Sequence, residues 1–195
     1  MKRIEPWKKL GPLQVLAESH GRSLVMQKYI DQAGELKEYS RFRGKHFSCI
    51  ILPVTKEGKV LVVRQYRPAA EEITLELPGG SNKYEEQTPE SVAREEFAEE
   101  TSDYTPGKII PLLSAGCWFE PSSIDIIYYP YLFLECVKTD KITRADDGEY
   151  IELMEVHLQE WMIMCETGQV RDSKSLVVTA LARKHLYNER GLLKW

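Results

Sequence analysis

The chain has 195 residues, of which 43% are hydrophobic and 29% charged, and its formal net charge is −4 at pH 7. These values are typical of a globular protein that buries about 70% of its unfolded surface, and the basic excess of a protein that binds nucleic acid polymers is missing. The first 16 residues carry charges without a continuous apolar run, so we predict neither a signal peptide nor a membrane contact and expect a cytoplasmic protein. Four scattered cysteines without a CxxC pair indicate reduced thiols.

The start of the chain reads as short strands separated by polar turns, the pattern of a small antiparallel sheet. The expected strands and turn are Leu13–Glu18, Ser23–Ile30, Asp31–Gly34 and Leu36–Phe42. We therefore predict an N-terminal β subdomain over residues 1–45 and a main domain over residues 46–195.

The main domain is expected to begin with a hairpin, Phe47–Val54 and Val60–Tyr66. Arg64 and Arg67 flank the aromatic Tyr66 at its end. Two guanidinium groups there could hold a pyrophosphate through forked, charge-assisted hydrogen bonds. Taken alone, the same string is more often an exposed strand end with arginines that reach into solvent.

A strand, a glycine turn and an acidic helix follow. Apolar and polar residues alternate over Ile73–Leu77, which predicts a half-buried strand with Ile73, Leu75 and Leu77 on one side. Pro78–Gly80 ends it. Thr88 offers a hydroxyl N-cap and Pro89 suits the first helical position, so a helix is predicted to begin at Pro89.

The two faces of this helix differ. Val92, Ala93 and Phe97 are expected to face a core. Residues 85–100 hold seven glutamates and one base, and three of the acids are predicted to lie close together: Glu96, Glu99 and Glu100. A hard divalent cation would relieve their repulsion, whereas a helix of this kind taken alone is more often a solvated acidic face.

The stretch LELPGGSNKYEEQTPESVAREEFAEETS resembles the Nudix box, the motif of hydrolases that cleave nucleoside diphosphates linked to another moiety. The first half of the motif fits Gly80, Glu86, Arg94 and Glu95. The second half fits one residue later, at Glu96, Phe97, Glu99 and Glu100. We choose the later register because it gives Phe97 the apolar position, and the loop from Gly80 to Thr88 then carries one extra residue.

This register leaves two departures from the family. Glu95 stands where the family has an arginine that orients a neighbouring glutamate, and Ser102 stands where it has a helix-ending glycine. An acid at position 95 would weaken or reshape metal binding, and Arg94 could act in place of the arginine from one position away. A serine in a left-handed cap would cost about 1–2 kcal/mol.

The resemblance implies a set of ligands. Mg²⁺, with Mn²⁺ as the alternative, would be held by Glu96, Glu99, Glu100 and the carbonyl of Gly79. Glu96 would also be catalytic. Substrate contacts would come from Gly80, Arg67 and, less firmly, Arg64, because RQYR resembles a segment of sugar-nucleotide Nudix enzymes.

After the helix we expect two strands joined by a loop: Ile109–Leu113, Ser114–Ser123 and Ile124–Cys136. Trp118 and Phe119 in the loop could equally stack on a nucleobase or cap the core. Pro130 indicates an edge or a bulge in the long strand.

Residues 146–152 form an acidic stretch before a strand predicted over Ile151–Leu158. The resemblance implies that an acid here assists the attacking water, with Glu149 as first candidate and Asp147 as second. A solvated turn is the alternative, because Asp and Gly are ordinary turn residues.

Two helices are predicted near the C-terminus, Leu158–Thr167 and one that begins near Ser173 with Asp172 as its cap. The expected inward residues of the second helix are Leu176, Val177, Ala180, Leu181 and Leu186.

The resemblance implies an α/β fold of the α+β kind, an α/β/α sandwich around a mixed central sheet, preceded by the small antiparallel β subdomain, which commonly forms a two-fold homodimer. A simple sheet extension in a monomer is the alternative. The implied activity is metal-dependent hydrolysis of a nucleoside diphosphate sugar, similar to ADP-ribose, to nucleoside monophosphate and sugar phosphate. A catalytically weakened nucleotide-binding or sensor protein is the first rival, and a structural domain without a ligand is the second.

Overall fold

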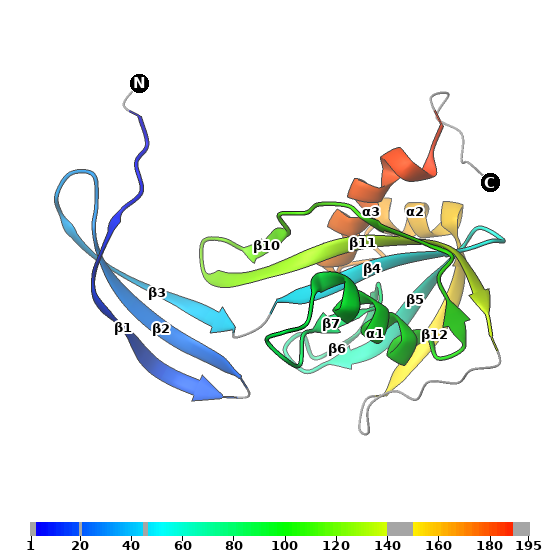
Figure 1. The fold of residues 1–195 in the computed structure, drawn as a ribbon, viewed down its shortest axis with the longest axis horizontal. Coiled ribbons are helices and arrows are strands. Elements are labelled where there is room, and N and C mark those ends of the chain that lie inside the picture. Colours follow the sequence, from blue (N-terminus) through cyan, green and yellow to red (C-terminus); the bar gives the residue numbers. More distant parts are fainter. Residues whose placement is uncertain (1–2, 20, 45–46, 140–149, 189–195) are drawn as a thin grey trace. The chain divides into compact units, whose positions relative to one another are not determined.

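The computed structural model describes residues 3–19, 21–44, 47–139 and 150–188. Two compact units make up the chain, and each is drawn from two segments (Figure 1). The first unit is Met1–Phe47 with Trp118–Ile127, and the second is Ser48–Cys117 with Tyr128–Trp195. The predicted boundary between residues 45 and 46 stays a prediction.

The first unit is built on an antiparallel meander of β1 (Lys8–Ser19), β2 (Arg22–Ile30) and β3 (Leu36–Gly44). A register shift in β1 falls at Gly11, which has φ +68°. The buried Gln27 side chain donates to the backbone carbonyls of Leu10 and Gly11 at 3.1 and 3.2 Å. This amide therefore satisfies acceptors that the irregular ladder leaves unpaired.

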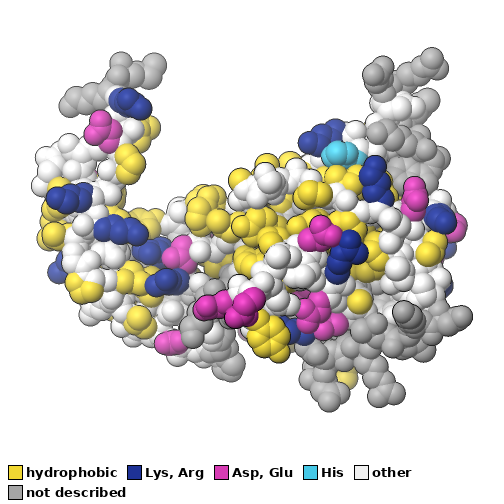
Figure 2. Space-filling view, viewed as in Figure 1, with side chains coloured by type: hydrophobic (Ala, Val, Ile, Leu, Met, Phe, Trp, Pro, Cys, Tyr) yellow, Lys and Arg dark blue, Asp and Glu magenta, His cyan; other side chains and the backbone are white. Residues whose placement is uncertain are grey.

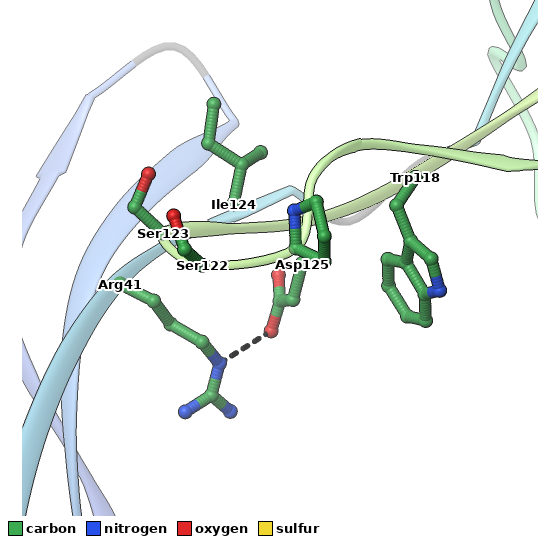
Figure 3. A pocket seen from close by; sticks show the side chains of 7 residues that line it. Arg41, Trp118, Ser122, Ser123, Ile124 and Asp125 are labelled. Atoms are coloured by element: carbon green, nitrogen blue, oxygen red, sulfur yellow. Dashed lines mark hydrogen bonds and ion pairs between the residues drawn. The ribbon is translucent and has the colours of Figure 1, made fainter.

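The same unit contains a small pocket, shown in Figure 3. Arg41 Nε of β3 donates to Asp125 Oδ2 at 2.9 Å, at the start of β11 (Ile124–Lys138). The other lining residues are Trp118, Pro121, Ser122, Ser123 and Ile124. Trp118 is 53% exposed, so the alternative in which it caps the core is wrong for this residue. A base contact by Trp118 stays a prediction.

The second unit is a mixed sheet. Its central strand β4 is buried along its whole length, and it pairs with β11 in parallel and with β5 and β7 antiparallel. β5 also pairs with β6 and β12, while β11 also pairs with β8 and β9. The bounds are β4 Ser48–Thr55, β5 Lys59–Arg67, β6 Glu72–Glu76, β7 Gly79–Ser81, β8 Tyr104–Thr105, β9 Lys108–Pro111 and β12 Ile151–His157.

Helices cover this sheet. α1 (Pro89–Thr101) packs on β4 and β7, α2 (Leu158–Glu166) on β12 and β5, and α3 (Ser173–Leu186) on β4. In Figure 1, α1 lies in front of the sheet and α2 and α3 lie behind it. The predicted fold class, with a mixed central sheet between helices, is confirmed. No helix in the described part of the chain is long and apolar enough to cross a membrane.

The predicted burial of two elements is wrong in part. In β6, Ile73 is 63% exposed and Glu76 is 3% exposed, because Glu76 is hydrogen-bonded to neighbours inside the unit. In α3, Val177 is exposed and Ser175 and Thr179 are buried. Their hydroxyls accept hydrogen bonds from Leu77 N at 2.8 Å and Trp161 Nε1 at 2.9 Å, which selects the buried face. Leu186 is buried as expected, whereas Ala180 is exposed and Leu176 and Leu181 are half-buried.

Three details of the backbone also differ from the prediction. The expected glycine turn contains the short strand β7, and the expected loop contains β10 (Cys117–Glu120), which pairs with β11. The bulge in β11 lies at Glu135, with φ +57°, instead of at Pro130. Pro130 is paired in register with Ile50, and its carbonyl accepts from Leu112 N, so it continues the ladder.

Candidate active site

The position of α1 follows from signals at its start and from one buried face. Thr88 and Ser91 form a capping box in which each side chain bonds the other residue's backbone N–H. Val92, Ala93 and Phe97 are buried, as predicted. The start at Pro89 and the inward face are therefore confirmed, and this orientation directs Glu96 and Glu100 toward β7.

Two acids of α1 contact the glycine turn. Gly79 N donates to Glu100 Oε2 at 2.8 Å. A Cβ on Gly80 would lie 2.3 Å from Glu96 Oε2, so the Glu96 carboxylate occupies the space that a side chain at position 80 would need. A Cβ on Gly79 would lie 2.1 Å from the carbonyl oxygen of Cys49. Glycine is required at position 79, where the neighbouring atom is backbone, whereas a side chain at position 80 would displace the Glu96 carboxylate.

Beneath this turn lies the thiol of Cys49, which is fully buried and donates to the carbonyl of Pro89 at 3.0 Å. Burial and the nearby charge of Glu96 raise the pKa of Cys49 to about 12. This thiol therefore stays protonated and is not a nucleophile at neutral pH. All four cysteines are free, as predicted.

The third acid, Glu99, lies beside a lysine. Lys83 Nζ, from the loop before α1, is 2.9 Å from Glu99 Oε1 and 3.4 Å from Glu95 Oε1. Arg94, the base that we expected to act for the missing arginine, pairs with Glu90 one turn earlier at 2.7 Å, on the exposed side of the helix. Because Arg94 is paired with Glu90, the expectation that it acts in place of the missing arginine is wrong.

Arg67 is held by a forked ion pair. Its Nε and Nη2 donate to the two carboxylate oxygens of Glu76 at 2.8 and 2.6 Å, and Thr74 Oγ1 donates to Glu76 Oε1 at 2.6 Å. Burial alone would raise the pKa of Glu76, but these bonds outweigh it and hold that pKa below its usual value. Hydrogen bonding to Glu76, with smaller effects from Glu100 and Asp172, raises the pKa of Arg67. The Arg67 side chain is still 42% exposed.

Arg64 has a different environment. Its Nη1 donates to Glu152 Oε2 on the adjacent strand β12 at 3.0 Å, and both side chains are exposed. Glu149 and Asp147 lie outside the described residues.

Sequence reasoning missed Glu76, Lys83 and Gln87. Glu76 alternates with apolar residues, a pattern that predicts the solvent side of its strand. The signal that could have indicated a buried ion pair is Arg67, the basic residue at the end of the neighbouring strand β5. Lys83 and Gln87 lie in a loop whose fold no periodic pattern predicts.

The donor atoms at the glycine turn are carboxylate and carbonyl oxygens, the kind that a hard divalent cation prefers. Within the described ranges, no group of three or more His, Cys, Asp or Glu side chains is arranged so that it could hold a metal ion. Mg²⁺, however, is commonly bound by one or two carboxylates and completes its shell with water and phosphate oxygens. Glu96 and Glu100 beside an open glycine turn fit that donor chemistry.

The chain was compared with known proteins. The model of the NUDIX domain matches residues 44–176. An ADP-ribose pyrophosphatase of Bacillus subtilis (strain 168) is 32% identical over 142 residues, which is 73% of this chain and 72% of that protein. A methanol dehydrogenase activator of Bacillus methanolicus is 28% identical over 127 residues, 65% of this chain and 66% of that protein.

Among solved structures, a crystal structure of an ADP compounds hydrolase matches with a TM-score of 0.80 and 16% identity, covering 95% of this chain and 97% of that one. At this identity the likeness supports the fold alone. The match to the NUDIX domain, by contrast, covers the box, the glycine turn and most of the second unit. The chain therefore belongs to the Nudix family of pyrophosphohydrolases.

Proposed function

We propose that this protein hydrolyses the pyrophosphate bond of a nucleoside diphosphate sugar similar to ADP-ribose, releasing a nucleoside monophosphate and a sugar phosphate. The proposal rests on one observation: the carboxylates of Glu96 and Glu100 lie against the Gly79–Gly80 turn. The name of the Bacillus subtilis relative supports the substrate class.

Glu96, Glu99, Glu100 and the Gly79 carbonyl would hold Mg²⁺, with Mn²⁺ as the alternative. When bound, the ion would neutralise phosphate charge and acidify water. Glu96, placed against Gly80, would act at the reacting phosphate as well as in ion binding. Gly80 would let the substrate approach its backbone.

Arg67 would contact a phosphate through the exposed part of its guanidinium, while Glu76 fixes its orientation. Arg64 is the weaker candidate, because it pairs with Glu152. Glu149, or Asp147, would accept a proton from the attacking water. The water oxygen bonds to one phosphorus, the bond from that phosphorus to the bridging oxygen breaks, and the bridging oxygen leaves with the other phosphate.

The test is a chromatographic product assay with ADP-ribose and Mg²⁺, with and without chelator. Glu96→Gln and Glu100→Gln should each lower kcat by at least about 100-fold, the effect of losing a few kcal/mol of transition-state stabilisation. Glu90→Gln is the matched control, because it makes the same chemical change on the outer side of α1, and it should leave kcat unchanged. Circular dichroism would check that each variant folds.

Full activity of either variant would contradict the assignment. No turnover of any nucleoside diphosphate sugar, together with Mg²⁺-dependent heat stabilisation, would instead support a nucleotide-binding or sensor role.

We also propose that the chain forms a homodimer through its first unit. Every residue of β1 except Leu13 is exposed, and large apolar side chains of this unit reach the surface (Figure 2). They include Ile4, Val15, Leu16, Leu36, Phe42 and Trp118. Apolar side chains gathered in one unit are typical of a surface that is covered by a partner.

A further inference from the structure

The proposed metal ligands lie on a part of α1 where four glutamates are close together. Glu95 occupies the position where the Nudix box has an arginine, and Glu96, Glu99 and Glu100 follow it within two turns. Like charges at these spacings repel each other on a helix. A positive charge from outside that set would therefore stabilise Glu99 in one orientation.

The described contacts locate this charge on the loop before α1. Lys83 Nζ is 2.9 Å from Glu99 Oε1, and the Glu99 side chain is only 19% exposed. We propose that Lys83 takes the place of the missing arginine and acts as a positioning residue that orients Glu99. This inference rests on the proposed function, because it treats Glu99 as a metal ligand.

The loop is fixed so that Lys83 reaches the helix. The Gln87 side-chain oxygen accepts from the backbone N–H groups of Lys83 and Tyr84 at 2.7 and 3.0 Å. The same amide donates from Nε2 to Glu95 Oε2 at 2.6 Å. Glu95 therefore anchors the loop through Gln87 and contacts Lys83 through its other oxygen.

This arrangement accounts together for the acid at position 95 and for the extra residue in the loop before α1. The register of the motif leaves one extra residue between Gly80 and Thr88. The longer loop supplies the base, and the acid at position 95 holds the loop, so the base that the family pattern has on the helix comes from the loop. Arg94 pairs with Glu90 instead.

The test removes the ammonium group of Lys83 and, in a second variant, also places a basic residue on α1 at position 95. Lys83→Met keeps the length of the side chain and removes its charge, and Lys83→Arg keeps the charge. The double variant Lys83→Met with Glu95→Arg places a base four residues before Glu99, the spacing at which opposite charges pair. Arg94→Met is the control for loss of a neighbouring base.

Two quantities are measured: Mn²⁺ affinity by electron spin resonance, without substrate, and kcat with ADP-ribose. Loss of a group that orients a metal ligand costs roughly 10–100-fold in affinity or activity, so Lys83→Met should weaken Mn²⁺ binding and turnover by at least about tenfold. Lys83→Arg and the double variant should recover most of both losses, and Arg94→Met should change neither. The melting temperature without metal should be the same in all variants.

Tighter Mn²⁺ binding by Lys83→Met would overturn the inference, because it would show that the lysine only competes with the cation. So would unchanged affinity and kcat in Lys83→Met beside a wild-type protein that binds Mn²⁺ and hydrolyses ADP-ribose, a result that leaves the proposed function intact. A wild-type protein that neither binds Mn²⁺ nor hydrolyses any nucleoside diphosphate sugar would overturn both.

Discussion

Ser102 ends α1 in a conformation that serine rarely adopts. Its φ is +55° and its ψ is −62°, and Asp103 N donates to Thr101 O at 2.6 Å across it, which defines a strained γ-turn. Ser102→Gly should raise the free energy of unfolding by roughly 1 kcal/mol, because glycine adopts positive φ without the Cβ penalty. Urea denaturation measures this. Ser102→Ala, which keeps the Cβ, should give no such gain, and equal stability of the two variants would refute the strain.

Glu155 of β12 is bonded to side chains from three other strands of the second unit. It accepts from Lys59 Nζ at 2.7 Å, Tyr104 Oη at 2.5 Å and Lys138 Nζ at 3.2 Å. The bonds from Lys59 and Tyr104, with a smaller contribution from Lys138, lower the pKa of Glu155 from 4.5 to about 2. Its ionised form is therefore favoured in the folded state.

Glu155→Gln should lower the free energy of unfolding at pH 7 by about 1 kcal/mol, a figure reduced for the partial solvent exposure of the carboxylate. The difference from wild type should be constant above pH 4.5 and shrink as the pH falls toward 2, since a lowered pKa stabilises only where the unfolded carboxyl is ionised. Denaturation series at pH 7, 4 and 3 measure it. A difference that is independent of pH would mean that packing, and not charge, is lost.

At the scale of elements, α1 depends on its N-terminal cap. Thr88→Ala removes the acceptor of Ser91 N and should destabilise the protein by about 1 kcal/mol. Thr88→Ser keeps the hydroxyl and should behave as wild type in the same urea titration. If Ala and Ser variants unfold at the same denaturant concentration, the capping bond contributes nothing.

The elements themselves could be predicted where the signals are local. Thr88 and Pro89 place the start of α1, and Asp172, whose side chain accepts from Ser175 N, places the start of α3. Faces were harder to predict. Ser175 and Thr179 are buried because they satisfy donors far away in the sequence, and a pattern of apolar residues does not contain that information.

The candidate site shows the same division. The carboxylates of Glu96 and Glu100 could be predicted, since the register of α1 relative to the glycine turn follows from a motif. The partners of Arg67 and Glu99 could not, because Glu76 and Lys83 come from a neighbouring strand and an irregular loop. The acidic residues Asp147 and Glu149 stay predictions.

For the whole molecule, the proposed homodimer makes a simple prediction. Sedimentation at micromolar concentration should give twice the 22.5 kDa mass of the chain. Val15→Glu combined with Leu16→Glu should give the mass of a single chain, because a charge on each face of β1 opposes burial against a partner. Ile163→Glu, an equally exposed apolar site on α2, is the control and should not change the mass. A wild-type protein that sediments as a single chain would exclude the dimer.

The passage of β11 through both units constrains how the protein can be recombined. Residues 118–127 belong to the first unit, although they are encoded within the gene segment of the second. A single genetic crossover near residue 47 would therefore bring a foreign meander together with a resident Trp118–Ile127 segment. Exchange of the whole first unit between relatives requires three crossovers, near residues 47, 117 and 127. We therefore expect Arg41 of β3 and the segment Trp118–Ile127, whose Asp125 pairs with it, to vary together between relatives.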